Sequence, residues 1–422
     1  MTMDRRAFLK AGAAGAALAG VSGCAALPGS GAKARVAVVG GGYGGATAAK
    51  YIRMLDPSIE VVLIEPNEAF VSCPISNMVL GGFRTMADIT TPYSGLARYG
   101  VRVVRDTATA IDMARKQVLL ARGNPVGFDR VIVSPGIDFM WEALPAMGSP
   151  EAQSRVLHAW KAGPQTAQLR QQLVAMRDGG VYVLSVPLAP YRCPPGPYER
   201  VSQVAAYFKA AKPRSKILLL DENADVTSKG PLFKKAWGEL YPGMIEYRGN
   251  SKAVDVDVRA GAVKLEFGDV KGDVLNVLPP MKAGSIAAPY ITANRRWCEV
   301  DWLTFESKAV KGVHVLGDSL QVAPAMPKSA TMANGQGKIC AAAVVALLNN
   351  EAPNPSPTLI NTCYSMVSDR LAIHVASVHK YDERDRTFKA VPGSGGVSSA
   401  MNEAEGAFTM NWARNIWADT LA

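Results

Sequence analysis

The chain has 422 residues, of which 48% are hydrophobic and 19% charged, and its formal net charge is +10. This composition excludes an intrinsically disordered chain, and the length allows two or three domains with packed cores. The basic residues form no run interleaved with aromatic residues, which argues against nucleic-acid binding and favours an acidic protein or a small anion as partner.

The segment 1–31 has the layout of an export signal. The string "DRRAFLK" is followed by the apolar run "AGAAGAALAGV", a pattern typical of a twin-arginine signal. An alanine-rich amphipathic helix is the alternative, but the run has no polar face. Because the run is too short for a permanent membrane span, the sequence predicts export to the periplasm.

The string "VSGC" within this segment resembles a lipoprotein processing site, in which Cys24 would be acylated. Ordinary signal cleavage a few residues later is the alternative, and in both cases we expect no catalytic role for Cys24. An odd number of other cysteines in an oxidising compartment leaves at least one without a disulfide partner. These cysteines are Cys73, Cys193, Cys298, Cys340 and Cys363.

A dinucleotide-binding βαβ unit is predicted at residues 35–65. An apolar strand, a glycine turn, a helix and a second apolar strand follow one another, with GxGxxG at Gly40, Gly42 and Gly45. Gly40 permits a tight turn, Gly42 lets the backbone approach a pyrophosphate, and Gly45 lets the helix pack on the strand. Glu65, 20 residues after the last glycine, would accept hydrogen bonds from a ribose.

Two later segments, 128–138 and 312–319, each contain a strand followed by a turn of small residues. In this order they resemble the flavoprotein disulfide reductase superfold, which implies that Asp318 reaches the ribityl chain of FAD. The helix that follows would direct its positive dipole end toward the flavin.

The middle of the chain has the strand-like runs "GGVYVLSVP" and "KILLLDEN". After the first run, where a pyridine nucleotide site needs glycines, stands "LAPYRCPPGPYER". Prolines have no backbone N–H to offer to a pyrophosphate. We therefore expect a second domain that keeps the Rossmann-like fold without binding NAD.

Five strings occur in an order that carries a family resemblance: "CPISNMVLGG", "HAWKAGPQT", "PYRCPPGPYER", "GDS" and "NTCYSMV". They resemble the flavoprotein subunit of flavocytochrome c sulfide dehydrogenase over nearly the whole chain after the signal. The resemblance implies that Cys73 carries FAD through a thioether. The position of Cys73 in a loop shortly after Glu65 agrees with this, and an ordinary loop cysteine or a disulfide partner is the alternative.

The resemblance further implies a redox-active disulfide between Cys193 and Cys363 beside the flavin. A structural disulfide, which would add about 4–5 kcal/mol by the chain-entropy estimate, is the alternative. Hydrosulfide is expected to attack one of the two sulfurs, which gives a persulfide and a thiolate. The attacked sulfur and the final sulfur product stay open. Glu199 matches a family glutamate near the disulfide that could handle protons, whereas an exposed acid at a helix start is the alternative.

The sequence contains no CxxCH haem motif, so haem is expected on a separate c-type cytochrome subunit, in a heterodimer. The four histidines show no metal-ligand spacing, and we predict no metal site. Cys298 and Cys340 are expected to form a second disulfide or to be buried thiols. Trp412 and Trp417 are expected in the core, with contacts to flavin or partner as the alternative.

The predicted fold class is α/β, with two Rossmann-like dinucleotide-binding domains, the second degenerate, and a C-terminal α+β domain. The predicted divisions are the signal 1–31, FAD-binding domain 32–145 and 287–354, degenerate NAD-like domain 146–286, and C-terminal domain 355–422. The predicted function is exported, FAD-dependent sulfide oxidation with a c-type cytochrome as acceptor. Sulfide:quinone oxidoreductase is one alternative, and a flavin-bearing redox partner subunit without its own sulfide turnover is another.

Overall fold

The computed structural model describes residues 31–422, and Cys24 with nearly all of the predicted signal lies outside these residues. A five-stranded parallel sheet carries the predicted FAD-binding domain, with strand order β21-β9-β1-β2-β5. Its strands are rich in buried valine, isoleucine and leucine, as expected for a parallel sheet covered on both faces. Their bounds are β1 (Ala34–Val39), β2 (Ile59–Ile64), β5 (Val101–Val104), β9 (Arg130–Val133) and β21 (Val313–Val315).

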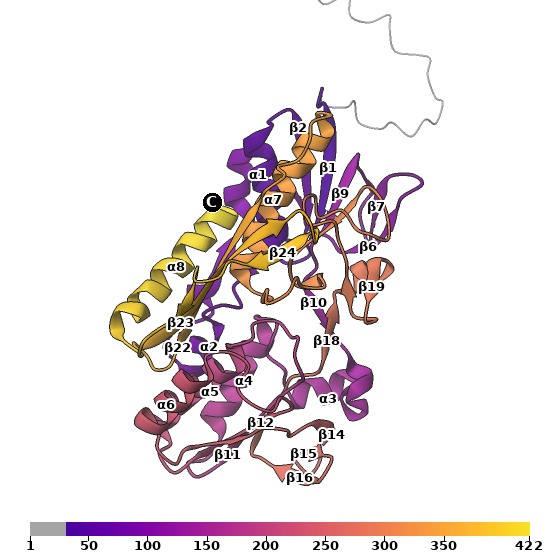
Figure 1. The fold of residues 1–422 in the computed structure, drawn as a ribbon. Helices are drawn as coiled ribbons and strands as arrows, with labels where there is room; N and C mark the ends of the chain where they lie inside the picture. Colours follow the sequence, from indigo (N-terminus) through magenta and orange to yellow (C-terminus); the bar gives the residue numbers. More distant parts are fainter. Residues whose placement is uncertain (1–30) are drawn as a thin grey trace, which may run out of the picture. The chain divides into compact units, whose positions relative to one another are not determined.

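Two helices complete this domain, α1 (Tyr43–Leu55) and α7 (Ala330–Leu348), and they pack side by side (Figure 1). Strand β21 and helix α7 come from the far side of the middle domain in the sequence, so the first domain is built from two separate stretches of chain. Ser329 caps α7 by accepting a hydrogen bond from the backbone N–H of Met332.

A second parallel sheet, with strand order β13-β12-β11-β17, carries the middle domain. It forms the lower part of Figure 1, next to a small antiparallel sheet of β14, β15 and β16. The bounds are α4 (Pro164–Ala175), β11 (Val181–Val186), α5 (Gly196–Ala211), β12 (Lys216–Asp221), α6 (Gly230–Leu240), β13 (Ile245–Arg248), β14 (Ala253–Asp257), β15 (Ala262–Leu265), β16 (Gly268–Lys271) and β17 (Val274–Val277).

The C-terminal part is an antiparallel sheet with one long helix, α8, lying along it (Figure 1). The bounds are β22 (Thr358–Met366), β23 (Ala372–Asp382), β24 (Thr387–Ala390), β25 (Gly396–Val397) and α8 (Glu403–Leu421). This arrangement, with the two parallel sheets, confirms the predicted fold class.

Short elements connect these layers. They are β3 (Ala69–Val71), α2 (Ser76–Gly81), β4 (Thr90–Pro92), β6 (Ala108–Asp112), β7 (Gln117–Leu120), β8 (Val126–Gly127), β10 (Ile137–Phe139), α3 (Pro150–Arg155), β18 (Met281–Ala283), β19 (Ile291–Ala293) and β20 (Trp297–Cys298). Within residues 31–422, no helix has the length and apolar character needed to cross a membrane.

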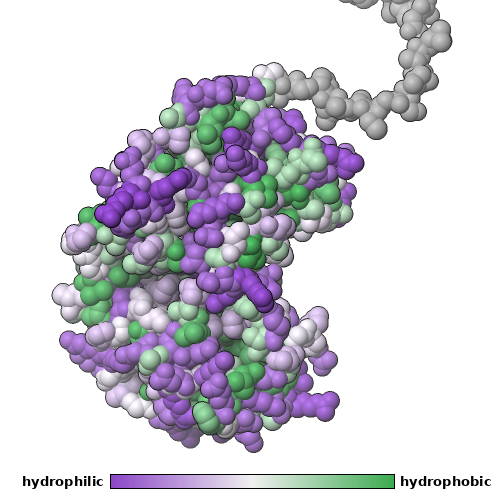
Figure 2. Space-filling view, turned by 45° about the vertical axis from the view of Figure 1, so that its right-hand side comes forward, coloured by the Kyte–Doolittle hydropathy of each residue, from purple (hydrophilic) through white to green (hydrophobic). Residues whose placement is uncertain are grey.

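One cluster of buried apolar side chains runs through both parallel sheets. Cys298 and Cys340 belong to it as buried free thiols, as the buried-thiol interpretation expects. Figure 2 shows hydrophilic residues over most of one face, with hydrophobic residues in small groups between them.

Candidate functional site

A cavity of about 570 Å³ lies where the three parts of the chain meet. Its wall brings together predicted site residues that are far apart in the sequence. These are Gly40, Gly42, Glu65, Cys73, Cys193, Glu199, Asp318 and Cys363. Of the predicted set, Gly45 alone stays behind the wall, where it packs against the turn.

The glycine turn has the geometry that a dinucleotide requires. Gly40 has a φ of +99°, and a Cβ at this position would lie 2.3 Å from the Ser134 carbonyl oxygen. A Cβ on Gly45 would lie 1.9 Å from the Gly40 carbonyl oxygen, so helix and strand touch there. At Gly42 nothing lies within 4 Å, and the helix N-terminus that begins there faces open space. This cradle fits a pyrophosphate.

Two carboxylates flank the same cavity. Glu65, at the end of β2, is buried, and its Oε2 accepts a hydrogen bond from the Gly41 N–H at 2.7 Å. Asn67 donates to the other oxygen from its backbone N–H at 2.9 Å and from its side chain at 2.6 Å. Asp318 follows Gly317, and burial raises the pKa of its carboxyl group. These acids fit the ribose and ribityl hydroxyls of FAD.

Cys73 lies on the cavity wall between β3 and α2, and its thiol is free. The backbone N–H of Ala162 donates to its Sγ at 3.4 Å, and the Trp160 carbonyl lies 3.8 Å from the same sulfur. The middle domain therefore holds this thiol toward the cavity. Trp412 also lines the cavity, as the flavin-contact alternative expects, whereas Trp417 donates from Nε1 to the Tyr43 hydroxyl at 3.1 Å.

The structure brings Cys193 and Cys363 to one cavity although 170 residues separate them. Both are free thiols, and burial raises the pKa of each. Cys193 has a φ of +59°, a left-handed conformation that is costly for a residue with a Cβ and concentrates at functional sites. Its N–H donates to the Lys328 carbonyl at 2.9 Å, and its carbonyl accepts from Gly196 at 2.9 Å. The disulfide between them stays a prediction.

Glu199 lies in the first turn of α5 and is only 7% exposed, so the exposed-acid alternative is wrong. Its Oε1 accepts from the Met366 N–H at 2.9 Å, and its Oε2 accepts from the Asn77 side chain at 2.8 Å. Burial raises the pKa of its carboxyl group, while these hydrogen bonds and the nearby Lys229 and Arg200 oppose the rise. The Glu199 carboxyl group therefore gives up its proton at a higher pH than an exposed glutamate does.

Arg200 was not predicted from the sequence as a site residue. It is 2% exposed, and its guanidinium lies 4.7 Å from the centre of the Trp160 ring. It donates to the carbonyls of His158 and Ala159 at 3.0 and 2.7 Å and to Asn77 at 3.0 Å. Arg200 therefore joins α5 to the loop that holds Cys73.

The turn after β12 also bears on cofactor choice. Asp221 ends this strand, where an NAD site places the acid that binds ribose. Here its carboxylate is fully buried and accepts hydrogen bonds from Tyr198 at 2.8 Å, Tyr247 at 3.2 Å and Asn223 at 2.7 Å. Protein side chains thus already use the Asp221 carboxylate as a hydrogen-bond acceptor, in the place where an NAD site would offer it to a ribose. In the described part of the chain, no cluster of His, Cys, Asp and Glu side chains forms a metal-binding set.

Comparison with known families agrees with this geometry. Residues 166–279 match the model for the central part of the sulfide dehydrogenase [flavocytochrome c] flavoprotein chain. Residues 355–421 match that of the flavocytochrome c sulphide dehydrogenase flavin-binding domain, and residues 34–176 match pyridine nucleotide-disulphide oxidoreductase. A sulfide dehydrogenase flavoprotein chain from Chlorobaculum thiosulfatiphilum is 69% identical over 45 residues, which cover 11% of this chain and 94% of that sequence.

This chain belongs to the flavocytochrome c sulfide dehydrogenase flavoprotein family. The family resemblance expected from the sequence is therefore confirmed. The flavin-binding match and the fold support FAD as the cofactor of this family member.

This chain is also similar to sulfide:quinone oxidoreductases. The mitochondrial enzyme of Dictyostelium discoideum is 23% identical over 299 residues, which cover 68% of this chain and 65% of that protein, slightly under two thirds of its length. The X-ray structure of the sulfide:quinone oxidoreductase from Aquifex aeolicus superposes with a TM-score of 0.75 at 16% identity, and covers 92% of this chain and 91% of that one. At this identity the superposition shows a shared fold.

The glycine turn of this family member supports a paired prediction. We expect Gly45→Ala to destabilise the fold by about 3 kcal/mol, because its new methyl group meets backbone. We expect Gly42→Ala to cost about 1 kcal/mol or less but to lower flavin content, since its methyl group would occupy the space for the pyrophosphate. Thermal unfolding and the flavin-to-protein absorbance ratio measure the two effects. Equal flavin content in wild type and Gly42→Ala would contradict the pyrophosphate cradle.

Proposed function

We propose that this protein oxidises hydrosulfide at the pair Cys193 and Cys363 beside FAD and delivers electrons to a c-type cytochrome subunit. The observation that carries the proposal is the convergence of both cysteines and buried Glu199 on the cavity that holds the FAD-type glycine turn. In the oxidised protein the two cysteines would form a disulfide, the form that hydrosulfide attacks.

Each residue has a defined part in this chemistry. One cysteine receives the sulfur and becomes a persulfide, and the other leaves as a thiolate. Glu199, held by Asn77 and the Met366 N–H, takes or gives the proton as charge builds on the pair. FAD, when bound, accepts two electrons and can release them one at a time.

We further propose that pyridine nucleotides play no part in turnover. The prolines between β11 and α5 remove backbone N–H donors that a pyrophosphate would need. The carboxylate of Asp221, the acid that would bind a ribose, instead accepts hydrogen bonds from Tyr198, Tyr247 and Asn223. NADH added to the purified protein is expected to leave the flavin oxidised. Bleaching of the flavin by NADH would overturn this part of the proposal.

The electron acceptor separates our proposal from its main alternative. The relationship to sulfide:quinone oxidoreductases favours a membrane quinone as the second candidate. Purified protein given sulfide should reduce a c-type cytochrome faster than a soluble ubiquinone analogue, when both rates are followed by absorbance at equal acceptor concentrations. A faster quinone rate, with binding to liposomes, would favour the alternative.

The role of Glu199 is testable by an isosteric change. Glu199→Gln should lower the rate of flavin reduction by sulfide about 10²-fold, the lower end of the range for loss of an acid–base group. Because burial raises the pKa of this carboxyl, its titration should shape the rate profile above the usual glutamate range. Stopped-flow rates across pH measure both effects, and an unchanged profile in the variant would assign Glu199 a purely structural role.

We also propose export by the twin-arginine route, on the grounds of the "DRRAFLK" string and the apolar run, with a periplasmic location and lipid attachment at Cys24 as an added feature. Cell fractionation of a variant with Arg5 and Arg6 replaced by lysine should show the protein retained in the cytoplasm. Normal export of that variant would remove the argument. Labelling with a radioactive fatty acid, lost in Cys24→Ala, checks lipidation.

A further inference from the structure

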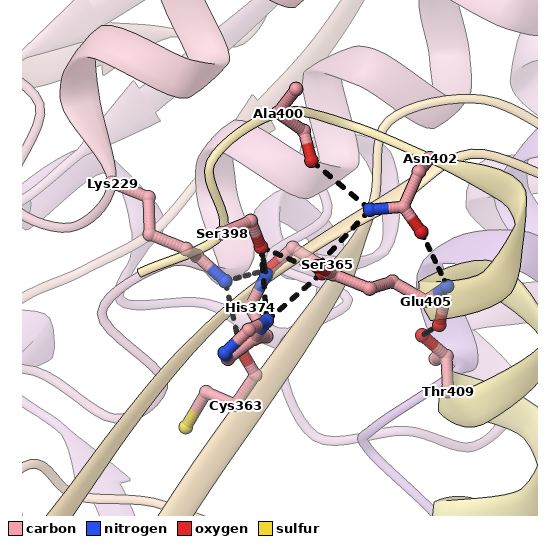
Figure 3. A network of polar contacts seen from close by, with 9 residues as sticks. All are labelled: Lys229, Cys363, Ser365, His374, Ser398, Ala400, Asn402, Glu405 and Thr409. Atoms are coloured by element: carbon pink, nitrogen blue, oxygen red, sulfur yellow. Dashed lines mark hydrogen bonds and ion pairs between the residues drawn. The ribbon is translucent and has the colours of Figure 1, made fainter. Parts of the chain in front are cut away.

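A buried lysine, Lys229, hydrogen-bonds to the backbone of β22 at Cys363. Lys229 immediately precedes α6, is 7% exposed, and has a φ of +56°. Its Nζ donates to the Cys363 carbonyl at 2.9 Å and to the Ser365 hydroxyl at 2.8 Å (Figure 3). Its left-handed backbone and buried ammonium group are both costly, which points to a role beyond filling space.

The ammonium group of Lys229 has neutral hydrogen-bond partners. In residues 31–422 its acceptors are a carbonyl and a hydroxyl oxygen, neither of which compensates a buried positive charge. Burial accordingly lowers its pKa to about 8, and negative charge on Cys363, Glu199 and Cys193 opposes that shift. The charge of Lys229 would therefore be balanced best when a nearby thiol ionises.

The two cysteines differ in how their surroundings treat negative charge. Burial raises the pKa of Cys363, Lys229 opposes this most strongly, with Asn361 and Ser329 also lowering the pKa, and Glu199 raises it by the smallest amount. For Cys193 burial also raises the pKa, Cys363 and Glu199 raise it further, and Arg192 and Lys229 lower it by smaller amounts. The contacts agree with this difference, because Lys229 Nζ donates to the backbone carbonyl of Cys363 and, among the described residues, to no atom of Cys193.

We propose that Lys229 is a positioning residue that makes Cys363 the leaving thiolate, so that hydrosulfide attacks Cys193. This inference rests on the proposed function and assigns its two sulfurs. In the step, the HS⁻ sulfur forms a bond to Cys193 Sγ, the Cys193–Cys363 disulfide bond breaks, and its electron pair stays on Cys363 Sγ. The products are a Cys193 persulfide, which keeps the proton of HS⁻, and the Cys363 thiolate beside Lys229. Leaving-group stability favours this direction.

The test measures thiol ionisation without sulfide. The purified flavoprotein is reduced anaerobically with dithiothreitol, desalted and alkylated with iodoacetamide across pH, and each cysteine is followed by peptide mass spectrometry. We expect the alkylation midpoint of Cys363 to lie below that of Cys193. In Lys229→Met the Cys363 rate at pH 8 should fall about tenfold, equivalent to one pKa unit.

A control at another lysine and two further changes of Lys229 keep the test decisive. Lys50 is another buried lysine, but it donates to backbone carbonyls at the end of α8 and not to Cys363, so Lys50→Met should leave both midpoints unchanged. Lys229→Arg should restore the Cys363 midpoint, and Lys229→Gln replaces Lys229→Met if that variant fails to fold. A lower midpoint for Cys193 in the wild type, or no change without the Lys229 charge, would overturn the inference.

Sulfide then distinguishes this inference from the proposed function. After one equivalent of sulfide and rapid alkylation, mass spectrometry should find the added sulfur atom on Cys193. Sulfur on Cys363 would overturn the inference and leave the proposed function standing. If neither cysteine gains sulfur, both the proposed function and the attack on Cys193 are wrong. The pH midpoints of alkylation then still show whether Lys229 stabilises the Cys363 thiolate.

Discussion

Replacing Cys193 by serine is expected to lower the rate of flavin reduction by sulfide at least about a thousandfold, a loss of about 4 kcal/mol of transition-state stabilisation. A serine hydroxyl forms no disulfide with Cys363, so hydrosulfide finds no sulfur to attack and no thiolate is released. Anaerobic stopped-flow absorbance of the flavin measures the rate. Cys363→Ser should give a loss of the same order, because both sulfurs belong to one reacting bond.

The matched control is Cys340→Ala. Cys340 is a fully buried free thiol in α7 that does not line the cavity, so its removal should leave the rate within about threefold at the temperature where the variant stays folded. If Cys193→Ser still reduced its flavin at the wild-type rate, sulfide oxidation at this pair would be wrong. Sulfide would then reduce the flavin by a route that does not involve this pair.

The βαβ unit could be predicted from the sequence because every signal for it is local. The glycine spacing, two apolar runs and Glu65 lie within 35–65, and β1, α1 and β2 form there as expected. The approach of Cys193 to Cys363 depends instead on how β22 lies across the cavity. No periodicity or spacing specifies that arrangement, and only the family resemblance pointed to it.

Three buried charged residues, Lys229, Arg200 and Asp221, were missed by the sequence patterns. Lys229 stands in "SKGPLFKK", where it cannot be distinguished from the two exposed lysines that follow it. Arg200 and Asp221 likewise resemble surface charges until tertiary packing buries them. Charge in a sequence predicts exposure as the usual state, and functional sites are where that expectation fails. The one sequence signal that pointed toward Arg200 was its neighbour Glu199, a predicted site residue, in the string "YER".

Replacing Cys73 by alanine is expected to change the flavin from fully retained to fully released on acid denaturation. In the wild type, a thioether to Cys73 would keep the yellow colour with the precipitated polypeptide. The Ala162 N–H holds Sγ toward the cavity, so the thiol is placed for attachment before the bond forms. Absorbance of the pellet and the supernatant after acid precipitation measures the outcome.

Cys193→Ala is the control for this experiment, since it removes a thiol from the same cavity and should keep the flavin bound to the pellet. Free flavin from the wild type would contradict the thioether and leave the family membership intact, because that rests on the matches over 166–279 and 355–421. The folded Cys73→Ala variant should still hold FAD without the covalent bond, since the glycine turn and Glu65 lie apart from the sulfur. Loss of all flavin from the folded variant would show that the thioether, rather than this cradle, supplies most of the affinity.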